Sequence, residues 1–430
     1  MPSSSFEPKC VLGVDEIDLS TPEFWIRPWE EREGAFLTLR RERPMSFYTE
    51  GDTLGLVEPG PGYWAVTRQA DILEASRNPQ IYSSARGATS IPDMPPMFLD
   101  FFGGMINKDD PDHVRLRKLV SSGFTPRRLK GMDADVARAA SWAVDRVIER
   151  GECDFVTDLS SPFPIRIICE MMGIPESQHG FVFDRTNVIL GAGDPEYVAD
   201  VGNIVTALIT AGTELRDLMN DLRAHRLKNP TDDMTSALVH AEIDGEKLSE
   251  AEMASFFILL VVAGNETTRN AINHGMKALC DHPDQRAIWK ADFAGVAPTA
   301  IEEIVRWASP VIFMRRTTTA PTVLGGQKLD AGEKVVLFYS SGNRDELVFD
   351  EPFRFDLRRT PNEHVGFGGP GPHFCLGANL ARREIRVFFD ELFRRMPDLQ
   401  VTGEPERLAS NFIHGIKHMN CTFKPGRKAA

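Results

Sequence analysis

The segment HVGFGGPGPHFCLGANLARRE, residues 364–384, limits the possible folds more than any other part of this sequence. Glycine and proline dominate between Phe367 and Cys375, and a helical pattern begins just after the cysteine. Glycine lets a backbone approach a flat ligand closely and adopt positive φ angles. Backbone N–H groups of such a loop and the positive end of the following helix favour a cysteine thiolate. The segment therefore predicts a loop that presents the Cys375 sulfur to a ligand.

Cys375 has two alternative interpretations. It can be a buried structural cysteine in a turn, which is the ordinary state of a single cysteine. It can also bind zinc together with His364 and His373, but a closed zinc site needs a fourth ligand, and no CxxC or HxxxH element lies near. We interpret the other five cysteines as plain buried thiols, because they are scattered and form no CxxC pair. They are Cys10, Cys153, Cys169, Cys280 and Cys421.

A second unusual segment is the apolar helix that Ser249 and Glu252 open with a capping box. Its first half is apolar nearly all round, which predicts a helix through the protein interior. The sequence AGNETT, residues 263–268, interrupts it with a carboxylate, hydroxyls and a glycine. An unpaired buried Glu266 is costly, and Gly264 costs about 1 kcal/mol relative to alanine. Rules broken together in one turn indicate a functional site, whereas a kinked helix with a polar surface patch is the alternative.

The apolar spacing is mainly helical from about residue 111 to 310, and short strand patterns such as 63–66 and 334–338 lie nearer the ends of the chain. We therefore predict a mainly α fold with small β-sheets. Thr299 and Glu302 suggest the start of another helix. The first 25 residues are expected to be loosely held. A length of 430 residues would by itself allow two or three domains.

The charge balance excludes some classes of function. The net charge is −13, which argues against general nucleic-acid binding, because that needs a basic surface. The apolar run 256–263 is too short to cross a bilayer, and the N-terminal residues have no signal-peptide pattern. With the scattered cysteines, these features predict a soluble protein of the bacterial cytoplasm without a transmembrane anchor.

The cysteine segment closely resembles the signature loop of the cytochrome P450 family, FGxGxHxCxG. The matching residues are Phe367, Gly368, Gly371, His373, Cys375 and Gly377, and this loop is one residue longer between Phe367 and Cys375. The resemblance implies a single P450 domain over residues 1–430, with haem b held between the interior helix and the cysteine loop. It also implies a monooxygenase in which Cys375 is the axial ligand of the haem iron.

The same resemblance assigns roles to the AGNETT turn. Thr267 would be the hydroxyl that stabilises iron-bound oxygen, Glu266 would relay protons, and Gly264 would leave room for the oxygen. Both Glu266 and Thr267 are therefore our candidate catalytic residues. The ExxR element of the family corresponds to Glu303 and Arg306, which with Arg359 would form a structural network rather than part of the active site.

Further residues are implied as contacts of the haem. They are His113, Arg117, Gly264, Arg316, His364, Phe367, His373 and Gly377. The histidines and arginines among them would bind the propionates, since charged bonds to a carboxylate are strong. Arg315, next to Arg316, is the alternative for one of these positions.

Candidate pocket residues are apolar and come from several parts of the chain. They are Met97, Phe98, Leu99, Phe101, Phe102, Val188, Ile189, Leu190, Ala263, Val311, Phe313, Phe412 and Ile413. Together they suggest a large lipid-like substrate. Segments such as MMGIP, TNVILGAGDP and FIHGIK resemble the mycobacterial methyl-branched-lipid ω-hydroxylases. That resemblance implies oxidation at a terminal methyl group of a branched lipid, fatty acid or isoprenoid, and hydroxylation of a sterol side chain is the alternative.

Electrons would come from NAD(P)H through a ferredoxin reductase and a ferredoxin, because no flavin domain follows residue 430. Basic residues gather before and after the cysteine loop: Arg115, Arg117, Lys118, Arg127, Arg128, Lys130, Arg382, Arg383 and Arg386. In an acidic chain they would steer an acidic ferredoxin to the cysteine side, although ordinary solvated charge is the alternative. The rival functions are a peroxide-driven peroxygenase and a non-catalytic haem sensor, and the pair Glu266 and Thr267 argues against both.

Overall fold

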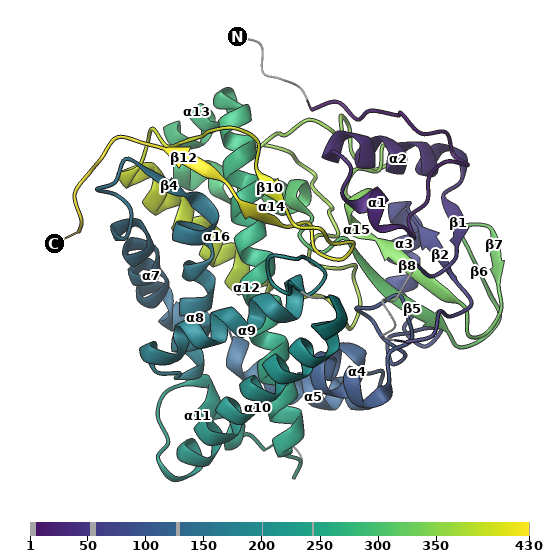
Figure 1. The fold of residues 1–430 in the computed structure, drawn as a ribbon, viewed down its shortest axis with the longest axis horizontal. Helices are drawn as coiled ribbons and strands as arrows, with labels where there is room; N and C mark the ends of the chain where they lie inside the picture. Colours follow the sequence, from purple (N-terminus) through teal and green to yellow (C-terminus); the bar gives the residue numbers. More distant parts are fainter. Residues whose placement is uncertain (1–5, 52–56, 126–129, 200, 243–244, 430) are drawn as a thin grey trace.

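The computed structural model describes residues 6–51, 57–125, 130–199, 201–242 and 245–429. Figure 1 shows a larger helical part beside a smaller part that contains the main sheet. The prediction of a mainly α fold with small sheets is confirmed. Arg127 and Arg128, two members of the predicted basic surface, lie outside the described residues.

The helical part is built around one long central helix, α12 (Glu250–Asp281). The helices that complete this part are α4 (Pro96–Gly103), α5 (Asp112–Ser121), α7 (Asp133–Asp145), α8 (Pro162–Met172), α9 (His179–Gly191), α10 (Ile204–Lys228), α11 (Met234–Val239), α13 (Pro283–Ala291), α14 (Phe293–Ala308) and α16 (Ala378–Arg395). Single turns η1 (Gly104–Asn107), η2 (Ser122–Phe124), η3 (Phe155–Ser160), η4 (Glu176–Gln178) and η5 (Val201–Asn203) connect some of them.

Helix α12 runs through the interior, as its apolar composition predicts. The Ser249 side chain accepts a hydrogen bond from the Glu252 N–H, and the Glu252 side chain accepts one from Ser249 N–H, so the expected capping box is present. The helix contacts α4, α8, α9, α10, α14 and α16. Because helices surround it, even the polar side chains of its middle turns are buried.

The smaller part contains a five-stranded sheet of order β1-β2-β8-β5-β3. The strands are β1 (Met45–Tyr48), β2 (Tyr63–Val66), β3 (Tyr82–Ser83), β5 (Phe313–Thr318) and β8 (Lys334–Phe338). Only β2 and β8 pair in parallel. Helices α1 (Pro22–Trp25), α2 (Trp29–Glu42), α3 (Gln69–Arg77) and α15 (Tyr339–Gly342) belong to the same part.

Three small sheets complete the described structure. Strands β6 (Thr322–Leu324) and β7 (Gln327–Leu329) form a hairpin, and β10 (Glu406–Arg407) pairs with β11 (Ile416–His418). A three-stranded sheet places β12 (Asn420–Thr422) between β4 (Glu152–Asp154) and β9 (Gln400–Val401). This last sheet joins the C-terminal segment to the chain that leads into α8.

Two expectations about local structure need correction. Helix α14 begins at Phe293, where the Asp292 side chain accepts a hydrogen bond from Gly295 N–H, and the expected start at Thr299 is wrong because that residue lies inside the helix. The expectation of a loosely held N-terminal segment also does not suit residues 17–25, since Ile17, Leu19, Phe24 and Trp25 are buried in an apolar cluster beside α2 and the sheet.

The ExxR element forms the expected network behind the cysteine loop. Arg306 Nε lies 2.7 Å from Glu303 Oε2, and both side chains are fully buried. Arg359 Nε lies 3.2 Å from the same oxygen, and Arg306 also donates to the carbonyl of Asn343 at 2.9 Å. These contacts tie α14 to the chain before residue 364 and fix the start of the cysteine segment.

Candidate active site

A cavity of about 240 Å³ lies between α12 and the cysteine loop. Residues of α12 that line it include Ala263, Gly264, Thr267, Thr268 and Ala271, whose spacing places them on one helix face. The opposite wall consists of 366–368 and 373–377, followed by the first turns of α16. The two unusual segments of the sequence therefore face each other across one cavity, as predicted.

Cys375 presents its sulfur to this cavity. It lines the cavity and remains accessible from it, while its backbone N–H donates to the Phe367 carbonyl at 3.0 Å. Burial raises the pKa of the thiol, whereas the N–H groups of Gly377 and Ala378 and the nearby Arg117 act to lower it. The backbone N–H groups after Cys375 and the guanidinium group of Arg117 on α5 favour a thiolate bound to a cation. This supports the predicted role of Cys375.

One end of the cavity is lined by cationic and imidazole groups, namely His113, Arg117, Arg316 and His373. Arg117 donates to the Phe374 carbonyl at 2.6 Å, Arg316 donates to a backbone carbonyl at 2.7 Å, and the two histidine rings lie 4.2 Å apart. Burial and the positive charge of Arg316 lower the pKa of His373 to about 2, so this ring is neutral.

The positive charge at this end of the cavity has no carboxylate partner on Arg117 or Arg316 in the described part of the chain. Among the described residues no carboxylate forms an ion pair with Arg117 or Arg316, and the nearest acid recorded for His113 is Asp110, at 3.6 Å from Nδ1. Two guanidinium groups facing an enclosed cavity without carboxylate partners suit a flat ligand with acidic substituents. The residues present therefore fit haem, with its propionates at this end and its iron at Cys375.

The choice between Arg315 and Arg316 follows from strand alternation in β5. Met314 and Arg316 share one face of the strand and line the cavity. Arg315 points to the other face, where it donates to the carbonyl of Ile91 at 2.9 Å and pairs with Asp93 at 2.5 Å. Arg316 is therefore the arginine that faces the predicted haem site.

His364 is not placed as predicted. It does not line the cavity; its Nε2 lies 3.0 Å from a carboxylate oxygen of Glu302, and its Nδ1 accepts from the Gly366 N–H at 3.0 Å. Burial would raise the pKa of Glu302, but hydrogen bonds from His364 and Arg382 lower it to about 2. His364 is thus a structural partner of α14 instead of a propionate ligand, because the chain turns at Gly366 before it reaches the cavity. The remaining predicted contacts, Phe367 and Gly377, do line it.

The middle turn of α12 carries a hydroxyl and a glycine that both line the cavity. Thr267 Oγ1 donates to the Ala263 carbonyl at 2.6 Å, and both residues face the cavity. A Cβ atom at Gly264 would lie 2.7 Å from the Ile168 Cδ1 of α8. Glycine at this position therefore lets α12 approach Ile168 of α8 closely at the cavity wall, and its role in leaving room for bound oxygen stays a prediction.

Glu266 is buried but turned away from the cavity wall. It forms a close ion pair with Arg269, three residues later, and its Oε1 accepts from Asn270 Nδ2 at 2.7 Å. Arg269 in turn donates to Asn187 Oδ1 of α9 at 3.0 Å and lies 3.3 Å from Ser161 Oγ. The sequence analysis missed Arg269, although its i, i+3 spacing from Glu266 was a visible signal.

Glu384 of α16 is a second acid that the sequence analysis missed. It lines the cavity and is almost fully buried. Burial raises the pKa of Glu384 well above its usual value, although a hydrogen bond with Thr268 of α12 opposes this effect. A carboxyl group with a raised pKa therefore lies beside the turn that carries Thr267.

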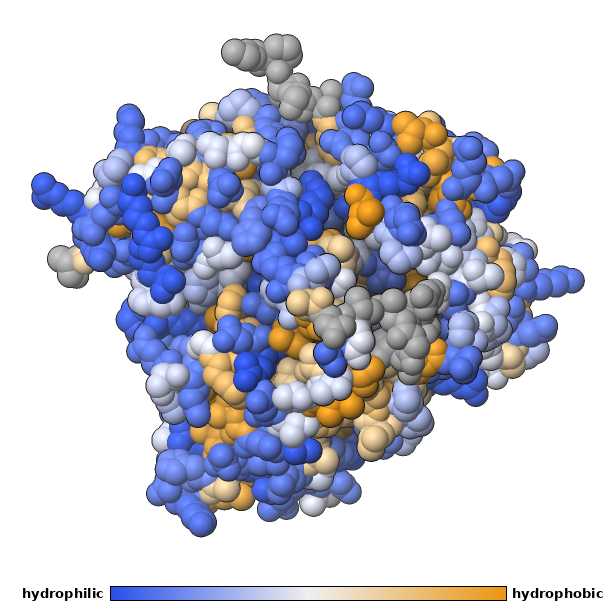
Figure 2. Space-filling model, viewed as in Figure 1, coloured by the Kyte–Doolittle hydropathy of each residue, from blue (hydrophilic) through white to orange (hydrophobic). Residues whose placement is uncertain are grey.

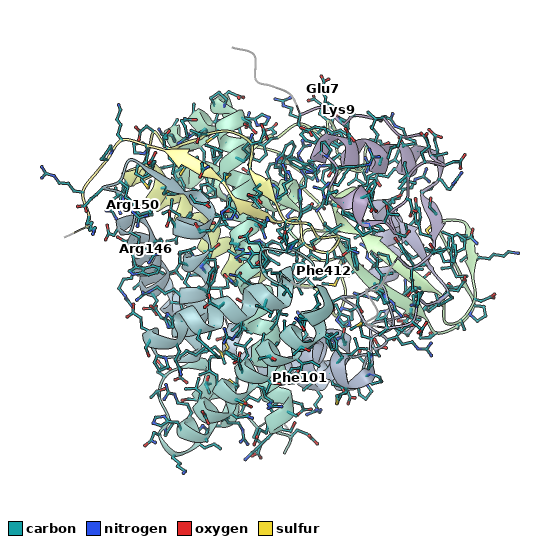
Figure 3. All side chains as sticks on the ribbon, in the orientation of Figure 1. Glu7, Lys9, Phe101, Arg146, Arg150 and Phe412 are labelled. Carbon is teal, nitrogen blue, oxygen red and sulfur yellow. The ribbon has the colours of Figure 1, made fainter. Side chains whose placement is uncertain are left out.

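Most of the predicted pocket residues do not line the cavity. Ala263 and Val311 do, whereas the predictions for Met97, Phe98, Leu99, Phe101, Phe102, Val188, Ile189, Leu190, Phe313, Phe412 and Ile413 are not supported. Helix α4 packs its rings against α10, where a Cβ at Gly212 would lie 2.5 Å from Phe101 (Figure 3). Phe313 belongs to the apolar cluster beside α2 and the main sheet, Phe412 packs against that cluster, and Ile413 is buried.

The apolar wall comes instead from residues near those that were predicted. Its members include Met105, Ile106, Phe124, Ile168, Phe256, Leu259, Leu260 and Met314. The turn after α4 reaches the cavity while α4 itself covers the outside, so Met97 is left 82% exposed. Figure 2 shows apolar surface in the lower middle of this face, where α4, α9 and α10 lie.

Part of the predicted basic surface is neutralised by acids from elsewhere in the chain. Arg115 pairs closely with Glu252, Arg383 pairs closely with Asp133, and Arg382 lies 2.6 Å from Glu302. The described part of the chain gives no ion pair to Lys118, Lys130 or Arg386. A reduced basic surface therefore remains on the cysteine side.

Comparison with known proteins agrees with this geometry. The sequence model of the cytochrome P450 family matches residues 296–405. Methyl-branched lipid omega-hydroxylases of Mycobacterium bovis and Mycobacterium tuberculosis are 52% identical over 415 residues, which is 96% of each chain. A steroid C26-monooxygenase of Rhodococcus jostii is 39% identical over 95% of this chain and 84% of its own. A Mycobacterium marinum cytochrome P450 solved with pseudoionone superimposes with a TM-score of 0.91 at 44% identity, over 96% of this chain and 100% of that one.

None of the helices in the described residues combines the length and apolarity needed to cross a membrane. Within the same residues no three or more histidine, cysteine, aspartate or glutamate side chains gather as ligands for a metal ion.

Proposed function

The chain belongs to the cytochrome P450 family and is a monooxygenase, and we propose that it hydroxylates the terminal methyl group of methyl-branched lipids. The observation that carries this proposal is the identity of 52% with methyl-branched lipid omega-hydroxylases over 96% of both chains. The apolar wall formed by residues such as Ile106, Leu260 and Met314 supports it, because it suits a hydrocarbon chain and offers few polar partners.

The family implies haem-thiolate iron, and we propose haem b as the form bound. Cys375 would bind the iron, and Arg117 and Arg316, with His113 and His373, would hold the propionates. When bound, this haem supplies the oxidising chemistry, which uses O2 and two electrons for each substrate hydroxylated. Those propionates would also provide the negative charge that the two arginines lack among the described residues.

The protein's own part in the reaction is to hold protons and exclude water. The Thr267 hydroxyl donates a hydrogen bond to the Ala263 carbonyl, and rotation about the Cβ–Oγ1 bond would turn the same O–H group toward the cavity. Gly264 keeps the space beside that hydroxyl open. Burial raises the pKa of Glu384 at the cavity wall, which favours its protonated form next to Thr268. Glu266 would have to leave Arg269 before it could move a proton to Thr267.

The experiment that tests the substrate compares three ligand classes on the purified enzyme. Methyl-branched fatty acids, straight-chain fatty acids of the same length and cholest-4-en-3-one are titrated while the Soret band is followed. The products formed with a ferredoxin system are then identified by mass spectrometry. Tight binding and terminal hydroxylation of the branched chains support the proposal. Turnover of the sterol alone would reject it in favour of a sterol side-chain hydroxylase, the alternative that the steroid C26-monooxygenase relatives support.

Two rival functions are separated by the source of electrons. A peroxygenase would turn over with hydrogen peroxide alone better than with NAD(P)H and a ferredoxin system. A haem sensor would show no substrate-dependent NAD(P)H consumption with redox partners. The buried acids near Thr267 argue against both rivals, because a sensor has no need of protons there and peroxide brings its own.

We propose that a ferredoxin, reduced by a ferredoxin reductase, docks on the basic surface around the cysteine loop. Lys118 and Arg386 lack acidic partners among the described residues, so they are free to contact an acidic protein. The variants Lys118→Glu and Arg386→Glu should slow reduction and weaken its salt dependence, whereas Lys328→Glu on the distant β7 should not. Equal rates for all three would reject this docking site.

We also propose that the protein is located in the cytoplasm, because the described cysteines are all free thiols.

A further inference from the structure

Two cysteines that are far apart in the sequence meet in the sheet β4-β12-β9. Cys153 lies on β4 and Cys421 on β12, and their Sγ atoms are 3.4 Å apart although 268 positions separate them in the chain. The interpretation of these cysteines as plain isolated thiols is therefore incomplete. None of the sequence patterns around them indicated that they would meet.

The strand register suits a covalent bond between them. Cys421 is directly opposite Cys153 in an antiparallel pair. Phe155 N–H donates to the Met419 carbonyl at 2.8 Å and Phe423 N–H to the Gly151 carbonyl at 2.9 Å, so every second pair, including the cysteines, is of the hydrogen-bonded kind. Such pairs have Cα atoms about 5.5 Å apart, which is the usual separation across a disulfide.

The two sulfur atoms contact each other and differ in their exposure to solvent. Cys421 is 1% exposed and directs its S–H toward the Cys153 carbonyl at 3.4 Å, while Cys153 is half-buried and can be reached from solvent. Cys280, which is also half-buried, contacts the Leu399 carbonyl and Arg286 and has no sulfur partner among the described residues. Cys153 and Cys421 thus differ from Cys280 in having a partner, and Cys280 serves as a matched control.

We propose that Cys153 and Cys421 form a reversible disulfide when the enzyme meets hydrogen peroxide. The Cys153 sulfur attacks one peroxide oxygen, which breaks the O–O bond and yields a sulfenic acid and water. The Cys421 sulfur then displaces the hydroxyl group, which leaves as water with the thiol proton. In balance, two thiols are oxidised, one peroxide is reduced, and two waters and one S–S bond form.

The rate of the first step should be low. Hydrogen bonding to Cys421 and burial both raise the pKa of the Cys153 thiol, so little thiolate is present at neutral pH. The bond should therefore form under sustained exposure to peroxide and be absent from freshly purified enzyme. Once formed, it would join the C-terminal strand to the segment that leads into α8.

The test treats the haem-loaded full chain with hydrogen peroxide, blocks remaining thiols with iodoacetamide, and maps peptides with and without reduction. We expect a linked Cys153–Cys421 peptide that loses two hydrogens and that dithiothreitol separates. It should be absent from Cys153→Ser and Cys421→Ser, and present in Cys280→Ser. Full alkylation of both cysteines, at a peroxide dose that has oxidised the exposed Cys10, would overturn the proposal.

Thermal unfolding gives a second measurement that does not depend on activity. A cross-link over 268 residues restricts the unfolded chain, so the oxidised enzyme should melt roughly 3–6 °C higher than the reduced enzyme. The same treatment of Cys421→Ser should leave the melting temperature unchanged. A rise of equal size in that variant would show that another modification causes it and would reject the disulfide. Neither result depends on which lipid is the substrate.

Discussion

Replacing Arg269 by methionine should destabilise the protein strongly. Arg269 and Glu266 form an ion pair in the middle of α12, and their side chains are 5% and 2% exposed. Methionine has a similar length but no charge, so it would leave the Glu266 carboxylate buried with only Asn270 as a side-chain donor. The hydrogen bond from Arg269 to Asn187 of α9 would be lost as well.

The size of the effect follows from burial. Removing one partner of a buried ion pair costs about 3–5 kcal/mol, because the other charge is left without compensation in a medium of low dielectric constant. The lost bond to Asn187 adds about 1 kcal/mol. We therefore expect Arg269→Met to lower the free energy of unfolding by about 4–6 kcal/mol.

A matched control is available on the protein surface. Arg138 pairs with Asp135 at the same i, i+3 spacing on α7, but its side chain is 68% exposed. Solvent screens that pair, so Arg138→Met should cost less than about 1 kcal/mol. The double variant Glu266→Gln/Arg269→Met should recover most of the stability lost in Arg269→Met, because replacing both charges removes the uncompensated one.

Urea unfolding followed by circular dichroism measures all four proteins, and the haem absorbance shows whether the active site stays intact. The reasoning is refuted if Arg269→Met costs no more than Arg138→Met. It is also refuted if the double variant is less stable than Arg269→Met, since the loss would then come from packing rather than from an unpaired charge.

Three further outcomes are expected. Thr267→Ala should raise peroxide release per NAD(P)H consumed, while Thr267→Ser should retain coupling, and unchanged coupling in the alanine variant would exclude the hydroxyl from proton control. Arg316→Met should weaken haem retention about tenfold or more, which is the loss of one charge-assisted bond, whereas Arg315→Met should lower stability without that effect; haem transfer to apomyoglobin measures both. Burial lowers the pKa of His274 and His414 well below 6.5, so their contribution to stability is present above pH 6.5 and is lost as pH falls below it. The free energy of unfolding should therefore fall as the pH drops below 6.5, and a His274→Asn/His414→Asn variant with the same acid dependence of unfolding as the wild type would contradict this.

The sequence was most informative where chemistry is concentrated in a continuous segment. Cys375, Phe367 and Gly377 lie in one loop, so their neighbours along the chain determine their position, and all three line the cavity. The capping box at Ser249 and Glu252 is equally local, and the helix that it predicts is observed. A few consecutive residues are enough to predict features of this kind.

Features that depend on the direction of a side chain could not be read in the same way. Arg315 and Arg316 are adjacent and chemically identical, and only the register of β5 against β8 shows that Arg316 faces the cavity. His364 belongs to the cysteine segment but turns toward Glu302 on a distant helix. In each of these positions a tertiary contact decides the role of the side chain.

Most of the predicted pocket residues do not line the cavity for a related reason. Apolar residues serve both the protein core and a lipid site, so their composition does not distinguish the two. Phe98 and Met105 are seven residues apart in one apolar segment, yet only Met105 lines the cavity. Helix α4, which carries Phe98, packs against α12, and its Phe101 and Phe102 rings lie beside Gly212 of α10. Composition therefore pointed to an apolar segment beside the cavity, but it could not show which of its side chains line the wall.

Helix α9 and the segment after it are held to the body of the protein by buried charged groups. After α9, Asp194 and Glu196 lie 3.2 Å and 2.9 Å from Lys417 Nζ of the C-terminal strand pair β10-β11, and the side chains of Asp194 and Lys417 are 4% and 10% exposed. Within α9, Asn187 is bonded to the buried Arg269, which also pairs with Glu266. Breaking a buried ion pair by removing one partner costs about 3–5 kcal/mol, because the other charge loses its compensation. Displacement of α9 and of the segment after it would therefore cost free energy at both places.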